Sequence, residues 1–132
     1  MKALDTNVLI RFLVNDDPRQ AKAVYRIFKQ SESNAEVFFV PALVLLETVW
    51  VLESVYESTR QEIIETIDEL LLMPILKFEA QSAVRNFINS ARENNTDLAD
   101  LLIAHHAKYS GCASVMTFDK RAAKYELFEL LK

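Results

Sequence analysis

Short β-rich segments alternate with longer helical patterns along this 132-residue chain, and no hairpin signal joins any two of the β-rich segments. The segments with strand character are residues 2–5, 36–40, 75–78, 112–118 and 127–131. Strands that are separated by helices pair in parallel, through right-handed crossovers. The sequence therefore predicts an α/β fold: one domain over residues 1–132, with a mostly parallel sheet of four to five strands flanked by helices (α/β/α).

The helices expected between these strands have recognisable start and stop signals. They cover residues 8–14, 18–30, 42–56, 59–73, 79–94, 96–109 and 120–125. Thr6-Asn7 is expected to cap the first helix, and Thr59 with Glu62 fits a capping box. The polar residues 31–34 are expected to form a loop.

The overall charge and the glycine content exclude several classes of protein. A net charge of −4 argues against a surface that attracts nucleic acid everywhere, although it leaves room for a local basic rim. The single glycine, Gly111, excludes a phosphate-binding loop or a dinucleotide fingerprint, since both need several.

The single cysteine and the absence of a long apolar run bear on the compartment. Cys112 has no partner for an internal disulfide, which favours a reducing cytoplasm, and we expect it to be buried as a small apolar residue. Met1 to Asp5 reaches an acid before any long apolar run, so no signal peptide is expected. The longest apolar stretch, residues 37–52, contains Glu47 and is too short to span a bilayer. We therefore expect a cytoplasmic protein without a membrane segment.

Four carboxylates stand in apolar surroundings, unlike the other acids of the chain: Asp5, Glu47, Asp100 and Asp119. A buried carboxylate is costly unless it is paired or coordinates a metal ion, and convergent carboxylates raise one another's pKa. A hard cation relieves both costs, and oxygen-only ligands favour Mg²⁺ or Mn²⁺ over Zn²⁺. Asp5 and Asp119 both follow predicted strands, and ligands gather at the carboxyl ends of parallel strands. The pattern therefore predicts a metal site.

Each of these acids also has a structural interpretation. Asp5 and Asp119 fit as caps of the helices that follow them, and Glu47 fits the wet edge of a buried helix. Asp97 and Asp100 are three residues apart, so Asp97 fits as an N-cap with Asp100 in the first turn. We favour the cap for Asp97 and the site for Asp100.

Other candidate groups carry weaker signals. His105 and His106 diverge by about 100° on a helix, so packing is favoured over shared metal binding. The basic residues that fit an RNA-binding rim are Arg11, Lys120, Arg121 and Lys124, although each also fits a solvated helix face. The helix over residues 42–56 is apolar nearly all round, which indicates a surface for a second copy or a partner peptide.

Four blocks of sequence together resemble a known family. They are LDTNVLIRFLV, a lone glutamate in an apolar helix, DLADLLIAHHA and VMTFDKRAAK. In this order and spacing they resemble the PIN-domain ribonucleases, in particular the VapC toxins of bacterial toxin–antitoxin pairs. The histidine pair departs from the family, in which small residues are more usual at this point.

The resemblance implies a fold, an activity and a set of roles. It implies a PIN-like fold and a metal-dependent endoribonuclease that hydrolyses RNA phosphodiester bonds with one or two Mg²⁺ or Mn²⁺ ions. The metal-binding and catalytic acids implied are Asp5, Glu47, Asp100 and Asp119, with Asp97 as a candidate fifth ligand. The polar neighbours implied are Thr6, Asn7 and Thr117. The implied partners are RNA, a cognate antitoxin and a second copy in a homodimer.

Two other functions are consistent with part of the pattern. A PIN-like module that binds RNA or protein without cleavage is one of them, although the intact set of four acids argues against it. The other is a phosphohydrolase of the haloacid-dehalogenase type with Asp5 as nucleophile. That class requires a second aspartate two residues later, where this chain has Asn7.

Overall fold

The computed structural model describes all 132 residues, as six α-helices, one 3₁₀ helix and five short strands. In chain order the elements are β1 (Lys2–Ala3), α1 (Thr6–Leu13), α2 (Pro18–Asn34), β2 (Phe38–Val40), α3 (Ala42–Ser54), α4 (Arg60–Leu71), β3 (Leu76–Phe78), α5 (Gln81–Ala91), α6 (Leu98–Tyr109), β4 (Val115–Thr117), η1 (Ala122–Lys124) and β5 (Phe128–Leu130). The predicted alternation of strands and helices is confirmed.

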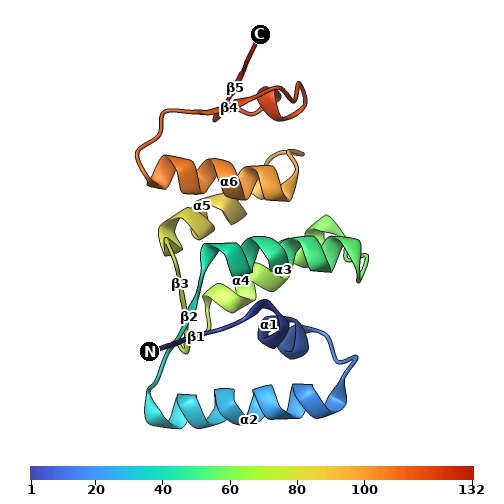
Figure 1. Ribbon diagram of the computed structural model, residues 1–132, viewed down its shortest axis with the longest axis vertical. Coiled ribbons are helices and arrows are strands. Elements are labelled where there is room, and N and C mark those ends of the chain that lie inside the picture. Colours follow the sequence, from blue (N-terminus) through green and yellow to red (C-terminus); the bar gives the residue numbers. More distant parts are fainter.

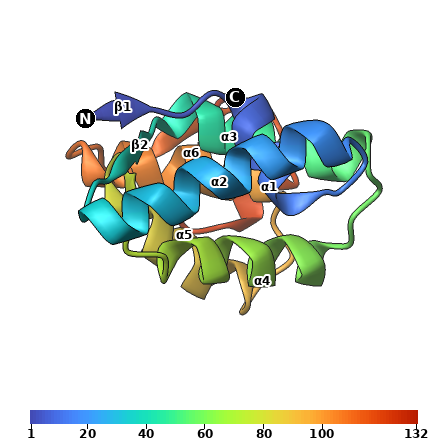
Figure 2. The ribbon, with the colours of Figure 1, turned by 90° about the horizontal axis from the view of Figure 1, so that it is seen from below.

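All strand pairings are parallel, as predicted, and the strands are divided between two sheets. One sheet has the order β1-β2-β3, and the other consists of β4 and β5. Figure 1 shows α5 and α6 between the two sheets along the long axis of the molecule. Strand β1 is at the edge of its sheet, as Figure 2 shows from below, so one side of its backbone has no neighbouring strand.

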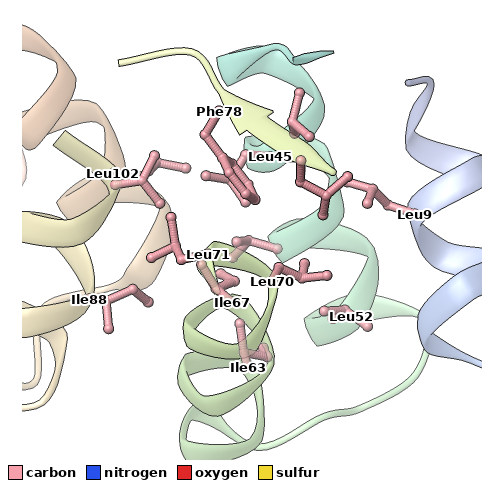
Figure 3. Packing of buried hydrophobic residues seen from close by; sticks show 14 of the residues in the cluster. Leu9, Leu45, Leu52, Ile63, Ile67, Leu70, Leu71, Phe78, Ile88 and Leu102 are labelled. Atoms are coloured by element: carbon pink, nitrogen blue, oxygen red, sulfur yellow. The ribbon is translucent and has the colours of Figure 1, made fainter. Parts of the chain in front are cut away.

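The hydrophobic core is formed by residues that precede β4 in the sequence. A cluster of 25 buried residues begins at Leu4 and ends at Leu102. Its centre is the apolar stripe of α4, which Figure 3 shows in contact with side chains from α3, β3 and α5. The predicted stripe consists of Ile63, Ile64, Ile67, Leu70 and Leu71, and all five are buried.

Helix starts are largely where the sequence placed them. The capping box of α4 is confirmed, since the Thr59 N–H donates to Glu62 Oε1 at 2.8 Å and the Glu62 N–H donates to Thr59 Oγ1 at 3.2 Å. The expectation that Thr6-Asn7 caps the first helix is wrong, and the structural interpretation of Asp5 as the cap of that helix is confirmed. Asp5 is the N-cap of α1 and Thr6 already belongs to the helix, because the Asp5 carboxylate accepts from the Asn7 N–H at 3.4 Å.

Three other predictions need correction. Residues 31–34 are not a loop but the last turn of α2, which ends where Ala35 adopts a left-handed conformation. The helix expected over residues 120–125 shrinks to the 3₁₀ turn η1. Cys112 is exposed rather than buried, because it follows Gly111 in the surface turn between α6 and β4.

None of the helices is both long and apolar enough to cross a membrane.

Candidate active site

A polar pocket of about 820 Å³ lies where α4 and α6 begin and where the chain leaves β4. Its acidic lining consists of Asp97, Asp100 and Asp119. Its basic lining consists of Arg60, Arg121 and Lys124. Two of the four acids that the sequence singled out, and the candidate fifth, therefore line one cavity with three cations beside them.

Helix α6 places its two acids through an N-cap. Asp97 is the cap residue, and its Oδ2 accepts from the Asp100 N–H at 3.3 Å, which confirms the structural interpretation of Asp97. Asp100 follows in the first turn, at the wall of the pocket.

The Asp100 carboxyl has a raised pKa. The largest cause is burial, followed by the negative charges of Asp97 and Asp119. Asp97 and Asp119 therefore lie close enough to repel the Asp100 carboxylate, and a bound cation would relieve this repulsion.

Asp119 is held by its own loop. Its Oδ1 accepts from the Arg121 N–H at 2.8 Å and the Ala122 N–H at 3.3 Å, so its side chain closes the turn that leads into η1. Its own N–H donates to Thr117 Oγ1 at 3.0 Å, and Thr117 is one of the predicted polar neighbours. These bonds use only Oδ1. They leave Oδ2 of Asp119 without a protein donor, so Oδ2 is available to bind a ligand in the pocket.

The other two predicted acids do not line this pocket. Asp5 is exposed at the carboxyl end of β1, with the polar neighbours Thr6 and Asn7 in the first turn of α1. Glu47 is exposed on the outer face of α3. No group of three or more acidic, histidine or cysteine side chains is arranged to hold a metal ion. The acids are the ligand type that Mg²⁺ and Mn²⁺ prefer, and such ions often bind through one or two carboxylates while keeping several waters. Asp100 and Asp119, which line one pocket and lie close enough for the charge of Asp119 to raise the pKa of Asp100, fit an ion held in that way.

The predicted basic residues fall into two groups. Arg121 and Lys124 line the pocket. Lys120, which precedes Arg121 in the sequence, is exposed and does not line it. Arg11 is engaged elsewhere: its guanidinium donates to Gln20 Oε1 at 2.7 Å and Asp16 Oδ1 at 3.1 Å.

The two histidines pack, as expected. His105 is buried, and its Nε2 lies 3.0 Å from the hydroxyl of Tyr125, which in turn donates to Ser90 Oγ at 3.0 Å. His106 Nδ1 donates to the Leu102 carbonyl at 2.9 Å. Neither histidine lines the acidic pocket.

Arg60 and Tyr125 also line the pocket, although neither was predicted from the sequence. A signal for Arg60 existed. It is the first residue of α4, where the helix dipole disfavours a positive charge. We find no comparable signal for Tyr125.

Comparison with known proteins gives two findings. Residues 2–127 match the family model described as the PIN domain. The chain is also 29% identical to a VapC ribonuclease of Aquifex aeolicus (strain VF5) over 124 residues, which is 94% of this chain and 91% of that protein. With a family match over nearly its whole length, and with the parallel strands and helices that the resemblance implied, the chain belongs to the PIN domain family.

Proposed function

We propose that this protein is a metal-dependent endoribonuclease, the toxin of a VapBC-type toxin–antitoxin pair. Membership of the PIN domain family and the likeness to a VapC ribonuclease support this proposal. The observation that carries it is the pocket in which Asp100 and Asp119 lie beside Arg121 and Lys124. Cations at this rim attract RNA phosphates, and the carboxylates supply ligands for a divalent ion.

We propose Asp5, Glu47, Asp100 and Asp119 as the complete set of catalytic carboxylates, with Asp97 as an auxiliary group. The proposed cofactor is Mg²⁺ or Mn²⁺, as one or two ions. Such an ion would be held by these carboxylates and, when bound, would activate water for attack on the phosphodiester. The chain's own contribution is to bind the RNA phosphates at Arg121 and Lys124 and to hold the acids in place.

Completing this set requires β1 and β4 to approach each other. All residues of β1 are exposed and β1 is an edge strand, while β4 pairs only with β5. A two-stranded sheet of three-residue strands is marginal alone, and unpaired strand edges favour further pairing. Parallel pairing of β4 with β1 would bring the carboxyl ends of both strands together, and with them Asp5 and Asp119.

The test is cleavage of a structured RNA by the purified chain, freed of any partner, with Mg²⁺, with Mn²⁺ or with chelator. We expect cleavage only with metal, and a loss of at least about 100-fold in Asp100→Asn, the size usual for a group that acts on the transition state. Asp68→Asn is the matched control, because Asp68 is on the surface of α4, 2.7 Å from Arg92. Binding of RNA without cleavage would favour the non-catalytic alternative, and a phosphoenzyme would favour the haloacid-dehalogenase type.

An apolar surface supports the proposed homodimer. Leu43 and Trp50 of α3 are 79% and 59% exposed, and Ile103 and Tyr109 of α6 are 46% and 60% exposed. Three of these residues, Leu43, Ile103 and Tyr109, line a second, mostly apolar pocket of about 480 Å³ between the two helices. Isolated exposed apolar residues are ordinary, but residues gathered round one groove indicate a partner surface. The measurement is the molecular mass in solution, and we expect Trp50→Glu to be monomeric if this face joins two copies.

A further inference from the structure

Arg60 makes an unusual set of contacts at the edge of the acidic pocket. Its guanidinium donates to three backbone carbonyls: Thr96 O at 2.7 Å, Asn94 O at 3.0 Å and Ala91 O at 3.2 Å. These carbonyls belong to the end of α5 and the connection that leads into α6. One side chain at the start of α4 therefore holds the whole turn between the next two helices.

The three backbone carbonyls that Arg60 contacts accept no hydrogen bond from a helix or strand. The last four carbonyls of a helix lack intrahelical donors, and Ala91 is the last residue of α5. Asn94 completes the same turn, since its Nδ2 donates to Ser90 O at 2.8 Å and its Oδ1 accepts from the Thr96 N–H at 2.9 Å. Asp97, the cap of α6, is the next residue after this turn, so the turn helps to determine where Asp97 lies.

The charge of Arg60 is also placed near acids without a direct ion pair. Burial lowers the pKa of Arg60, and the charges of Asp97 and then Glu53 oppose that shift, yet neither acid approaches the guanidinium within 4.0 Å. Glu53 itself has a raised pKa, first because of burial and then because of Asp97, with Arg60 opposing the shift. The cation therefore offsets part of the repulsion among the acids while its N–H groups bond to the backbone.

We propose that Arg60 is a positioning residue for RNA cleavage. It fixes the turn before α6, and through Asp97 it sets the place of Asp100 at the pocket wall. It contacts neither the scissile phosphate nor the metal ion. This inference rests on the proposed endoribonuclease function, because it assigns Arg60 a part in that same site.

Two substitutions separate positioning from general stability. Arg60→Gln removes the charge and most of the donors, whereas Arg60→Lys keeps the charge but not the planar fork that reaches three carbonyls. Arg92→Gln is the matched control, because Arg92 is the C-cap of α5, close to the same turn, but its guanidinium pairs only with half-exposed Asp68. All variants are compared as folded protein, with the folded fraction checked by thermal unfolding.

The readouts are kcat and KM on a structured RNA and the Kd for Mn²⁺ alone. Residues that hold metal ligands in place typically contribute 10–100-fold to metal affinity or activity. We expect Arg60→Gln to lower kcat and to weaken Mn²⁺ binding roughly 10–100-fold, with KM unchanged within about twofold, and Arg60→Lys to recover part of both. Arg92→Gln should match the wild type.

Several results would overturn the inference. A folded Arg60→Gln with wild-type kcat and wild-type Mn²⁺ affinity would do so, and so would a rise in KM alone, which would make Arg60 an RNA contact. If Arg60→Gln does not fold, Arg60→Lys decides, because wild-type kcat and Kd in that variant contradict positioning. If the wild type binds Mn²⁺ but cleaves no RNA, the proposed function fails while the Mn²⁺ comparison still tests Arg60. A wild type that binds no Mn²⁺ contradicts both.

Discussion

The two sheets of this protein have the same parallel pairing but opposite surroundings. In β2 and β3, Val40 is 0% and Phe78 is 3% exposed, and both belong to the main core. In β4 and β5 no residue is buried, and β4 carries Met116 at 64% exposure, with Phe118 next to it at 77%. Pairing alone therefore does not define a stable layer. A sheet becomes part of the core only when helices cover it.

Two of the acids of the proposed site are divided between these two sheets. Asp5 follows β1 of the covered sheet and Asp119 follows β4 of the exposed one, while Asp100 lies in the first turn of α6 between them. The C-terminal segment is attached to the helices by few polar contacts, chiefly from Tyr125 to His105 of α6 and to Ser90 of α5. Because little apolar surface is buried there, we expect this segment to open at a lower free-energy cost than the main core.

The largest effect should come from deleting a core side chain. Phe87 of α5 is 0% exposed, so Phe87→Ala should lower the free energy of unfolding by about 3–5 kcal/mol. Phe128 of β5 is only half-buried, and Phe128→Ala should cost roughly 1 kcal/mol. Urea unfolding measures both. Equal losses would show that the two sheets are equally integrated and would remove the contrast.

The next largest effect should be on RNA cleavage. If the divided acids form one site, Asp5→Asn should lower kcat at least about 100-fold, as much as Asp119→Asn does, although only Asp119 lines the pocket. The double variant should be little worse than either single one, since residues that act as a unit are not additive. If Asp5→Asn keeps the kcat of the wild type, catalysis depends only on the acids that line the pocket.

A smaller effect should follow from loosening the C-terminal segment. Tyr125→Phe removes a hydroxyl that bonds to buried His105 and to Ser90, and should lower the free energy of unfolding by about 1–2 kcal/mol. Amide hydrogen exchange in β4 and β5 should rise more than in β2. Tyr109→Phe is the control, because Tyr109 is 60% exposed, and it should be neutral. Unchanged exchange in β4 and β5 would show that other contacts hold the segment.

The smallest effect should be on the pH dependence of stability. Burial, and then the charges of Lys108 and His106, lower the pKa of His105 below its usual 6.5. The unfolded chain therefore binds a proton at a higher pH than the folded protein does. Stability should fall as pH drops from about 6.5 through the lowered folded pKa, and His105→Gln should flatten that slope. Urea midpoints between pH 4 and 7 measure it, and an identical slope in the variant would contradict the assignment.

The sequence predicted features that depend on neighbouring residues. The capping box at Thr59, the buried stripe of α4 and the cap at Asp97 are all set within one or two helical turns. The parallel pairing followed from the order of strands and helices.

The sequence did not predict features that depend on distant contacts. The carbonyl contacts of Arg60 join residues more than 30 positions apart, and the division into two sheets depends on which strand edges meet. Hydrophobic periodicity reports burial along one element, but it carries no information on either of these. For the same reason the sequence singled out the four acids individually, whereas the structure groups only Asp100 and Asp119 round the pocket.

The central claim is that Asp5 and Asp119 serve one metal site, although different sheets carry them. Titration of Mn²⁺ into the wild type, Asp5→Asn, Asp119→Asn and the double variant tests this claim most directly. We predict that each single variant weakens Mn²⁺ binding by roughly 10-fold or more and that the double variant is less than additive. Wild-type Mn²⁺ affinity in Asp5→Asn, or strictly additive losses, would contradict a shared site.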